Sequence, residues 1–448
     1  MLKKLQELFD RDRPASAATD EGTLHEKRDP YRALRSRNYR LWATGGLVSA
    51  VGGQMFSVAI GWELYERTHD AWALGLVGLV QAAPVILLAL PAGHLADRVD
   101  RRRIVLSMQA VTFVLWLAIA ACSYYTAPLA AFYGLLLLEA VAGAVAGPAR
   151  SAIVPQLVPT EDLANAVAWN SSRWQTASTI GPAIGGAAIA IFNTAWPVYL
   201  IAAVTALAFT TSVYLVRPRP FERPETDEGA WQSLVAGAKF VRAQKIILAT
   251  LTLDMFAVLF GGATALLPVY AKDILHTGPQ GLGWLRAAPA VGALAMGLFL
   301  AHRAPMKHAG RALLWAVAGF GAATIVFGIS RNFYLSLLML ALTGALDNIS
   351  VVVRHTLVQV LTPAHMQGRV SAVNSVFIGS SNELGAFESG AAARAFGPIA
   401  AVVSGGVATI LVVLGVAAAW PQVMKLGSLD DAAKESAARE EALKEAQK

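Results

Sequence analysis

Charged side chains inside long apolar runs are the residues of this 448-residue sequence whose type and position most directly suggest chemistry. A charge at the centre of a membrane helix costs about 2.5–3.5 kcal/mol on insertion scales, so each one needs a reason. Burial disfavours the ionised form of a carboxylate, which lets such a group bind and release a proton as its surroundings change. The acidic candidates for proton coupling are Glu139, Asp254, Asp347, Glu383 and Glu388, and the basic residues in similar runs are Arg173 and Arg286.

A second explanation fits the same seven residues, because opposite charges in an apolar environment can pair and fasten helices together. Both explanations stay open for each of them. Glu139 is the most specific candidate for proton coupling, since it is the only charged residue between Leu135 and Gly147.

The composition places these residues in a membrane. The chain is 55% hydrophobic and 15% charged, whereas roughly a quarter of the residues of a soluble domain are charged. Residues 71–95 and 104–138 contain no Asp, Glu, Lys or Arg, and both stretches exceed the ~18 residues that mark a membrane-spanning candidate. The polar first forty residues lack the apolar core of a cleaved signal peptide, so we expect the first membrane helix to be retained.

Twelve apolar segments predict about twelve membrane helices. Their approximate ranges are 41–64, 72–95, 103–125, 129–150, 164–191, 196–216, 246–271, 281–301, 312–329, 333–354, 368–393 and 398–419. Segments predicted on one side carry most of the Lys and Arg residues, ten of them within residues 1–40. By the positive-inside rule we expect both termini to be cytoplasmic, in a multi-pass protein of the inner (cytoplasmic) membrane.

The sequence contains an internal repeat. A shift of 204 positions superposes identical residues, and a shift of 205 superposes residues 78–84 on 283–289. Six helices separate the copies, an even number, so the two halves share one orientation across the membrane. This pattern predicts an all-α membrane protein of two parallel six-helix repeats, an architecture of transporters with a site near the midplane. The pairs at the shift of 204 include Arg150 and Arg354, Asn170 and Asn374, Gly181 and Gly385, and Gly186 and Gly390.

The repeat also predicts the domain organisation. We expect a cytoplasmic segment over 1–40, a six-helix half over 41–216, a cytoplasmic linker over 217–245, a second half over 246–420 and a cytoplasmic tail over 421–448. The linker contains an amphipathic stretch from Ala230 to Gln244, and the composition of the tail predicts a solvated helix.

Two pairs of polar residues are related by the repeat. Arg150 and Arg354 lie at the ends of the fourth and tenth predicted helices, where a cation complements the negative helix C-terminus. This position favours a structural or gating role over substrate binding. Asn170 and Asn374 either donate hydrogen bonds across a central interface or join neighbouring helices, and both interpretations stay open.

Other classes of function have no support in the sequence. The net charge of +7 is spread over short segments between apolar runs, without a nucleic-acid-reading motif. The sequence contains no phosphate-binding Gly-x-x-x-x-Gly-Lys loop, no His-Glu-x-x-His pair and no Gly-x-Ser-x-Gly turn. We therefore expect no nucleotide, metal, cofactor or nucleic-acid partner and no enzymatic activity. Cys122 is the only cysteine, which excludes an intrachain disulfide.

The segment Gly93-His-Leu-Ala-Asp-Arg-Val-Asp-Arg-Arg-Arg103 resembles the loop signature of the major facilitator superfamily. In that superfamily the loop acts as a latch of the cytoplasmic gate. The resemblance implies this role for Gly93, Asp97, Arg98 and Arg102. The second half has a degenerate copy, with His302, Arg303 and Lys307 at the matching positions.

A second motif, Gly181-Pro182-Ala-Ile-Gly185-Gly186, resembles the antiporter motif of the same superfamily. Small residues permit close helix packing, and the proline bends the helix. The layout of residues 29–420, with Asp29-Pro30-Tyr31-Arg32-Ala33-Leu34 before the first helix, resembles the branch of enterobactin exporters and macrolide efflux proteins.

The resemblance implies an exporter that moves an amphipathic small molecule, siderophore-like or drug-like, by alternating access. Proton coupling is predicted from the carboxylates inside the apolar runs and not from the resemblance. We expect the protein to be a monomer in the lipid bilayer. The alternatives are a lysophospholipid flippase, or a membrane enzyme or assembly protein that does not transport.

Overall fold

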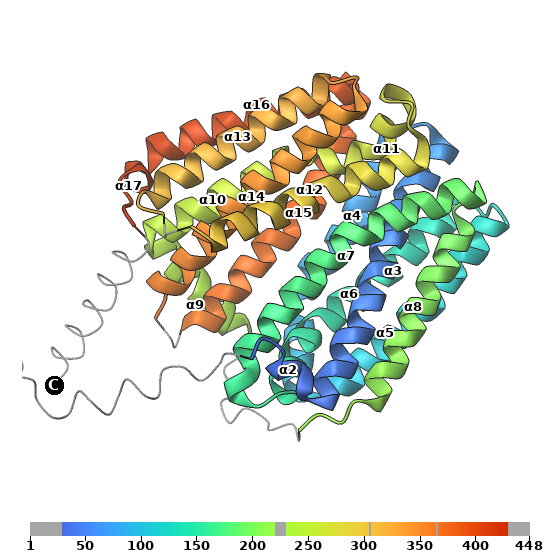
Figure 1. Cartoon of the computed structure of the whole chain (residues 1–448), viewed down its shortest axis with the longest axis horizontal. Coiled ribbons are helices and arrows are strands. Elements are labelled where there is room, and N and C mark those ends of the chain that lie inside the picture. Colours follow the sequence, from blue (N-terminus) through green and yellow to red (C-terminus); the bar gives the residue numbers. More distant parts are fainter. Residues whose placement is uncertain (1–28, 220–229, 304–305, 364–365, 429–448) are drawn as a thin grey trace, which may run out of the picture.

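The computed structural model describes residues 29–219, 230–303, 306–363 and 366–428, and this part of the chain is helical throughout, without strands (Figure 1). A short helix, α2 (Arg32–Arg35), precedes six long ones. These six form the first bundle: α3 (Arg37–Thr68), α4 (Ala71–Arg98), α5 (Arg101–Tyr124), α6 (Leu129–Ile153), α7 (Leu163–Phe192) and α8 (Trp196–Leu215).

The second bundle follows the amphipathic helix α9 (Ala230–Ala243), which packs on α15 and α10 and also contacts α4. Figure 1 shows the two bundles side by side, the first coloured blue to green and the second yellow-green to red. The second bundle comprises α10 (Lys245–Phe260), α11 (Leu267–Val269), α12 (Gly278–Ala301), α13 (Ala309–Ile329), α14 (Phe333–Leu361), α15 (Gln367–Phe396), α16 (Pro398–Ala419) and the short α17 (Pro421–Met424).

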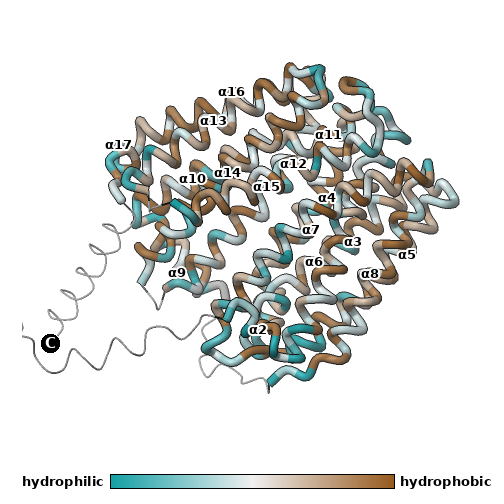
Figure 2. Tube along the Cα trace, in the orientation of Figure 1, coloured by the Kyte–Doolittle hydropathy of each residue, from teal (hydrophilic) through white to brown (hydrophobic). Residues whose placement is uncertain are grey.

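The long helices are apolar along their length and polar at their ends, as Figure 2 shows. Within the described residues, ten helices are long and apolar enough to cross a membrane. Helices α7 and α15 are 30 residues long but more polar, and both pack across the boundary between the bundles, α7 on α12 and α15 on α4. Because they face protein as well as lipid, they can carry more polar residues than a helix that faces lipid alone.

One expected helix is not continuous. The sequence predicted an unbroken helix over 246–271, but α10 ends at Phe260, and a 3₁₀ turn (Ala263–Leu266), the short α11 and a π-helical turn (Tyr270–Ile274) follow. Gly261 and Gly262 stand at the break, and two consecutive glycines weaken a helix. Pro268 follows without a backbone donor. The prediction of a continuous helix was wrong because these local signals outweigh the apolar pattern.

The bundles meet closely at one end, which we call the closed end; it contains Thr68, Phe192 and Gly278. The opposite end, with α2, α9 and Arg98, is called the basic end. At the closed end two pairs of glycines bring helix backbones together. A Cβ on Gly186 would lie 2.8 Å from the Cα of Gly283, and a Cβ on Gly390 would lie 2.6 Å from the backbone nitrogen of Gly75.

Three predicted segments fall partly outside the described residues. These are the N-terminal segment, of which residues 1–28 are not described, the linker, of which residues 220–229 are not described, and the tail, of which residues 429–448 are not described. The predicted amphipathic stretch of the linker corresponds to α9.

Candidate transport site

A central cavity of about 350 Å³ lies between the two bundles. Its charged residues come from three helices: Glu139 from α6, Arg286 from α12 and Glu383 from α15. The structure therefore brings together three of the seven charged residues that the sequence singled out. The aromatic wall is formed by Phe56 and Trp116, whose rings stack with centroids 4.8 Å apart.

The charges in this cavity influence one another. Arg286 and Glu139 both act electrostatically on Glu383. Arg286 also donates a 2.7 Å hydrogen bond to the hydroxyl of Ser57 on α3, and so joins the two bundles. Gln81, the repeat-related counterpart of Arg286, lines the same cavity. The central cavity therefore contains two carboxylates and one guanidinium, and both bundles line it.

A second chamber of about 200 Å³ adjoins the central cavity, and both are lined by Thr264, Asn382 and Ala386. Asp347 on α14 is its only acidic residue among the described ones. The backbone of the break after α10 forms part of its wall through Gly261 and Gly262. The central cavity and this chamber together make a two-part site that is lined by both bundles.

Asp254 does not line either of these two spaces. Its carboxylate pairs with the guanidinium of Arg354, and both side chains are almost fully buried, 8% and 4% exposed. The helix-fastening explanation therefore fits Asp254 best. The pair also gives Arg354 a partner other than the helix C-terminus. Its repeat-related counterpart, Arg150, instead donates a 2.8 Å hydrogen bond to Gln109 of α5.

The remaining charged and amide residues from the sequence lie apart from the cavities. Arg173 on α7 packs over Gly46 of α3, where a Cβ would collide with its guanidinium. Glu388 lines neither the central cavity nor the Asp347 chamber. The side-chain oxygens of Asn170 and Asn374 are buried and have no hydrogen-bond partner in the described structure. Neither interpretation of the two asparagines is therefore favoured.

The predicted gate loop joins α4 to α5 at the basic end. Arg102 donates hydrogen bonds to the carbonyl oxygens of Val213 and Tyr214, at 3.2 and 2.5 Å, and so caps α8. Asp97 and Arg98 are exposed. Nothing lies within 4 Å of a Cβ placed on Gly93, so this position has no close neighbour in this conformation.

The predicted antiporter motif does lie at close helix contacts. A Cβ on Gly181 would lie 2.9 Å from the carbonyl oxygen of Val51, and one on Gly185 would lie 2.9 Å from the Cα of Met55. Both contacts are with α3 in the same bundle, whereas Gly186 faces the other bundle. Pro182 interrupts the hydrogen bonding within α7.

The sequence interpretation missed a cluster that joins the bundles at the closed end. Lys272 forms a 2.7 Å ion pair with Glu66, and the hydroxyl of Tyr65 donates to Asp273. These residues follow apolar segments, and charged residues at such positions are usually interpreted as interfacial residues at the ends of membrane helices. The buried Glu63 was also missed, although it accepts 2.8 Å hydrogen bonds from Ser123 and Tyr199. The only indication of Glu63 and Glu66 in the sequence is that two acidic residues lie within one helical turn near a predicted helix end.

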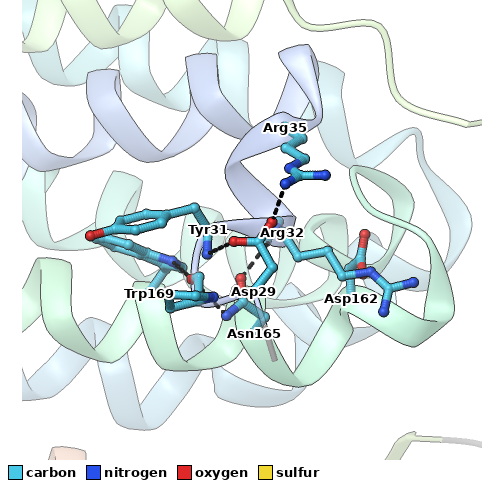
Figure 3. A network of polar contacts seen from close by, with 9 residues as sticks. Asp29, Tyr31, Arg32, Arg35, Asp162, Asn165 and Trp169 are labelled. Carbon is cyan, nitrogen blue, oxygen red and sulfur yellow. Dashed lines mark hydrogen bonds and ion pairs between the residues drawn. The ribbon is translucent and has the colours of Figure 1, made fainter. Parts of the chain in front are cut away.

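A network of polar contacts at the basic end attaches the segment before α3 to the start of α7 (Figure 3). Arg32 forms a 2.6 Å ion pair with Asp162, and Asn165 accepts a 3.0 Å hydrogen bond from the backbone nitrogen of Ala33. Asn165 and Trp169 each donate a 2.9 Å hydrogen bond to the carbonyl oxygen of Pro30. The segment that precedes α3 is thus fixed to the first bundle.

A leucine in place of Gly186 is expected to destabilise the closed end. The added side chain would collide with the backbone at Gly283, and overpacking of this kind costs typically about 1–3 kcal/mol. A cysteine at position 57, in a Cys122→Ser background, would then react with a membrane-impermeant maleimide added on the closed-end side. Gly143→Leu is the matched control, because nothing lies within 4 Å of a Cβ at Gly143. Equal labelling of the two variants would contradict the packing argument.

Two six-helix bundles around a shared cavity define the protein as a membrane transporter. A family model described as transmembrane secretion effector matches residues 29–447. The chain belongs to this family, which is part of the major facilitator superfamily, and its relatives are transporters rather than enzymes.

Two relatives are enterobactin exporters named EntS. The chain is 27% identical over 371 residues to the one from Escherichia coli O81 (strain ED1a), covering 82% of this chain and 87% of that protein. It is 26% identical over 367 residues to the one from Escherichia coli O1:K1 / APEC, with the same coverage. The resemblance to the enterobactin-exporter branch is confirmed.

Solved structures share the fold. The nucleoside transporter NupG superposes with a TM-score of 0.68 at 10% identity, covering 85% of this chain and 99% of that one. A bacterial homologue of the human lysosomal transporter Spinster, in an inward-facing and occupied conformation, gives 0.67 at 14% identity, covering 89% and 97%. The expected all-α fold of the major facilitator superfamily is confirmed.

Proposed function

We propose that the protein is a proton-coupled exporter that moves an amphipathic small molecule across the inner membrane by alternating access. The observation that carries this proposal is the pair of carboxylates, Glu139 and Glu383, in one cavity with Arg286 between the two bundles. A carboxylate that faces a cavity can exchange a proton with whichever side the cavity opens to. Export is favoured because relatives in the same family are named exporters.

The packing at the closed end supports alternating access. The glycine contacts and the ion pair between Glu66 and Lys272 hold the bundles together there, whereas Gly93 at the basic end faces open space. Opening at the closed end would require these contacts to separate, and closure at the basic end would bring the Gly93 face of α4 against a neighbour. The gate-loop role that the resemblance implies for Gly93, Asp97, Arg98 and Arg102 belongs to that second state.

Orientation and organisation form part of the proposal. The basic end carries the Lys- and Arg-rich segments, so the positive-inside rule assigns it to the cytoplasm together with both termini. The proposal keeps the sequence-predicted organisation into two halves, a cytoplasmic linker and a cytoplasmic tail. A complete cavity within one chain supports a monomer as the functional unit.

The test is proton movement in inverted membrane vesicles that contain the protein, with a pH-sensitive dye as the reporter. A catecholate siderophore, a macrolide and a lysophospholipid are added in turn after a proton gradient has formed. We expect the siderophore or the macrolide to discharge the gradient in vesicles with the protein and not in vesicles without it. Failure of all three to discharge it, together with lipid movement that ignores the gradient, would contradict proton-coupled export and favour a lipid flippase.

A further inference from the structure

Asp347 differs from the other carboxylates of the site because, within the described residues, no cationic side chain acts on it electrostatically. By contrast, Arg286 and Arg150 act on Glu383 and Glu139 respectively. No Lys, Arg or His lines the chamber around Asp347 in the described structure. A carboxylate without a partner inside a membrane helix is costly, so a positively charged ligand would be favoured beside Asp347.

The nearest described ion pair does not neutralise it. A small pocket next to the chamber is lined by both Asp347 and Asp254, which places the two carboxylates near one another. The guanidinium of Arg354 is already paired with Asp254. This region of the second bundle therefore contains two carboxylates and one cation.

The walls of the chamber suit an organic cation rather than a hydrated metal ion. Phe320 lines it, and the face of an aromatic ring attracts a cation. Thr324 and Thr343 supply two hydroxyls, but both donate to backbone carbonyl oxygens of their own helices. In the described residues no cluster of three or more His, Cys, Asp or Glu could hold a metal ion.

The break after α10 shapes this chamber. Gly261 and Gly262 bring irregular backbone to its wall, and a Cβ on Gly261 would collide with the ring of Phe320. Non-helical backbone at membrane depth is tolerated where it is buried in protein or lines a cavity, and broken helices frame substrate sites in transporters. The interrupted helix therefore coincides with the unpartnered carboxylate.

We propose that this chamber binds the cationic end of the transported molecule, a protonated amine or another organic cation held by Asp347 and the ring of Phe320. The rest of the molecule extends past Thr264 and Asn382 into the central cavity, where Phe56 and Trp116 offer an aromatic wall. The inference rests on the proposed function and narrows its substrate class to lipophilic cations.

The first test compares two probes of matched shape and opposite charge, tetraphenylphosphonium and tetraphenylborate. Binding is measured by titration calorimetry on the purified full chain in detergent, with empty micelles as the blank. Tetraphenylphosphonium is expected to bind, and tetraphenylborate is expected to bind about 10- to 100-fold more weakly, in line with a charge-assisted contact. Equal affinity for both, or tighter binding of the borate, would overturn the assignment.

Variants at position 347 locate the site. Asp347→Asn is expected to weaken tetraphenylphosphonium binding about 10- to 100-fold and to leave tetraphenylborate unaffected. Asp347→Glu keeps the charge and is the matched control, which is expected to retain most of the binding. Unchanged phosphonium affinity in Asp347→Asn refutes the proposal.

A second measurement needs no variant. Dicyclohexylcarbodiimide modifies buried carboxyl groups, and mass spectrometry identifies which ones have reacted. Tetraphenylphosphonium is expected to protect Asp347 from modification. Protection of Glu139 or Glu383 with Asp347 still reactive would place the cation in the central cavity and overturn the proposal.

The vesicle assay separates this inference from the proposed function. Discharge of the proton gradient by tetraphenylphosphonium, lost in Asp347→Asn, supports both. Discharge by a catecholate siderophore with no response to the phosphonium leaves proton-coupled export standing and refutes the cation site. Phosphonium binding that depends on Asp347 without any discharge of the gradient supports the cation site and contradicts proton-coupled export.

Discussion

Replacing Arg354 by methionine, with Asp254 left in place, is expected to lower the free energy of unfolding by about 3–5 kcal/mol. Both side chains of this pair are almost fully buried, so the variant leaves a carboxylate without a cation in a dry environment. Asp254 would then have to stay ionised without a partner or take up a proton. Thermal unfolding of the detergent-purified protein, monitored by size-exclusion chromatography, measures this loss of stability.

Two further variants make this test specific. Arg311→Met removes an exposed arginine at the start of α13 and is expected to change stability by no more than about 0.5 kcal/mol. The double variant Arg354→Met, Asp254→Leu removes both charges and should recover most of the loss, because apolar residues of similar volume can replace a buried pair. A double variant as unstable as Arg354→Met alone would show that packing, and not the unpaired charge, causes the effect.

Replacing Glu139 by glutamine is expected to abolish substrate-dependent proton movement in inverted vesicles. The glutamine keeps the size and hydrogen bonding of the side chain but cannot exchange a proton. Glu139 faces the central cavity, where Arg150 acts on it and it acts in turn on Glu383 of the other bundle. The dye signal on addition of substrate should fall to that of vesicles without the protein.

Substrate counterflow distinguishes a coupling defect from a collapsed cavity. In this assay labelled substrate exchanges for unlabelled substrate without any proton gradient, and Glu139→Gln is expected to retain it. Glu161→Gln, an exposed residue in the turn before α7, is the matched control and should keep both activities. Proton movement that persists in Glu139→Gln would remove this residue as the coupling group and leave Glu383 as the next candidate.

The residues of the site show how far the sequence reaches. The apolar runs, the repeat and the loop signature predicted the helices and the superfamily, because each depends on residues close in sequence or at a fixed spacing. The glycine motif also predicted close packing, and Gly181, Gly185 and Gly186 each lie against a neighbouring helix backbone. The two adjacent glycines, Gly261 and Gly262, indicate a break in the helix, but the apolar pattern around them predicted a continuous helix.

The sequence by itself determined that the chain is a membrane protein of two related halves and that a few charges lie within its helices, because hydrocarbon requires long apolar segments with satisfied backbones. Only the tertiary structure decided what those charges do. Asp254 pairs with Arg354, Glu139 and Glu383 share a cavity with Arg286, and Asp347 faces a chamber that no cation lines among the described residues. Partners of this kind are set by how each helix is rotated and which helix packs beside it, and neither is encoded at a fixed distance along the chain.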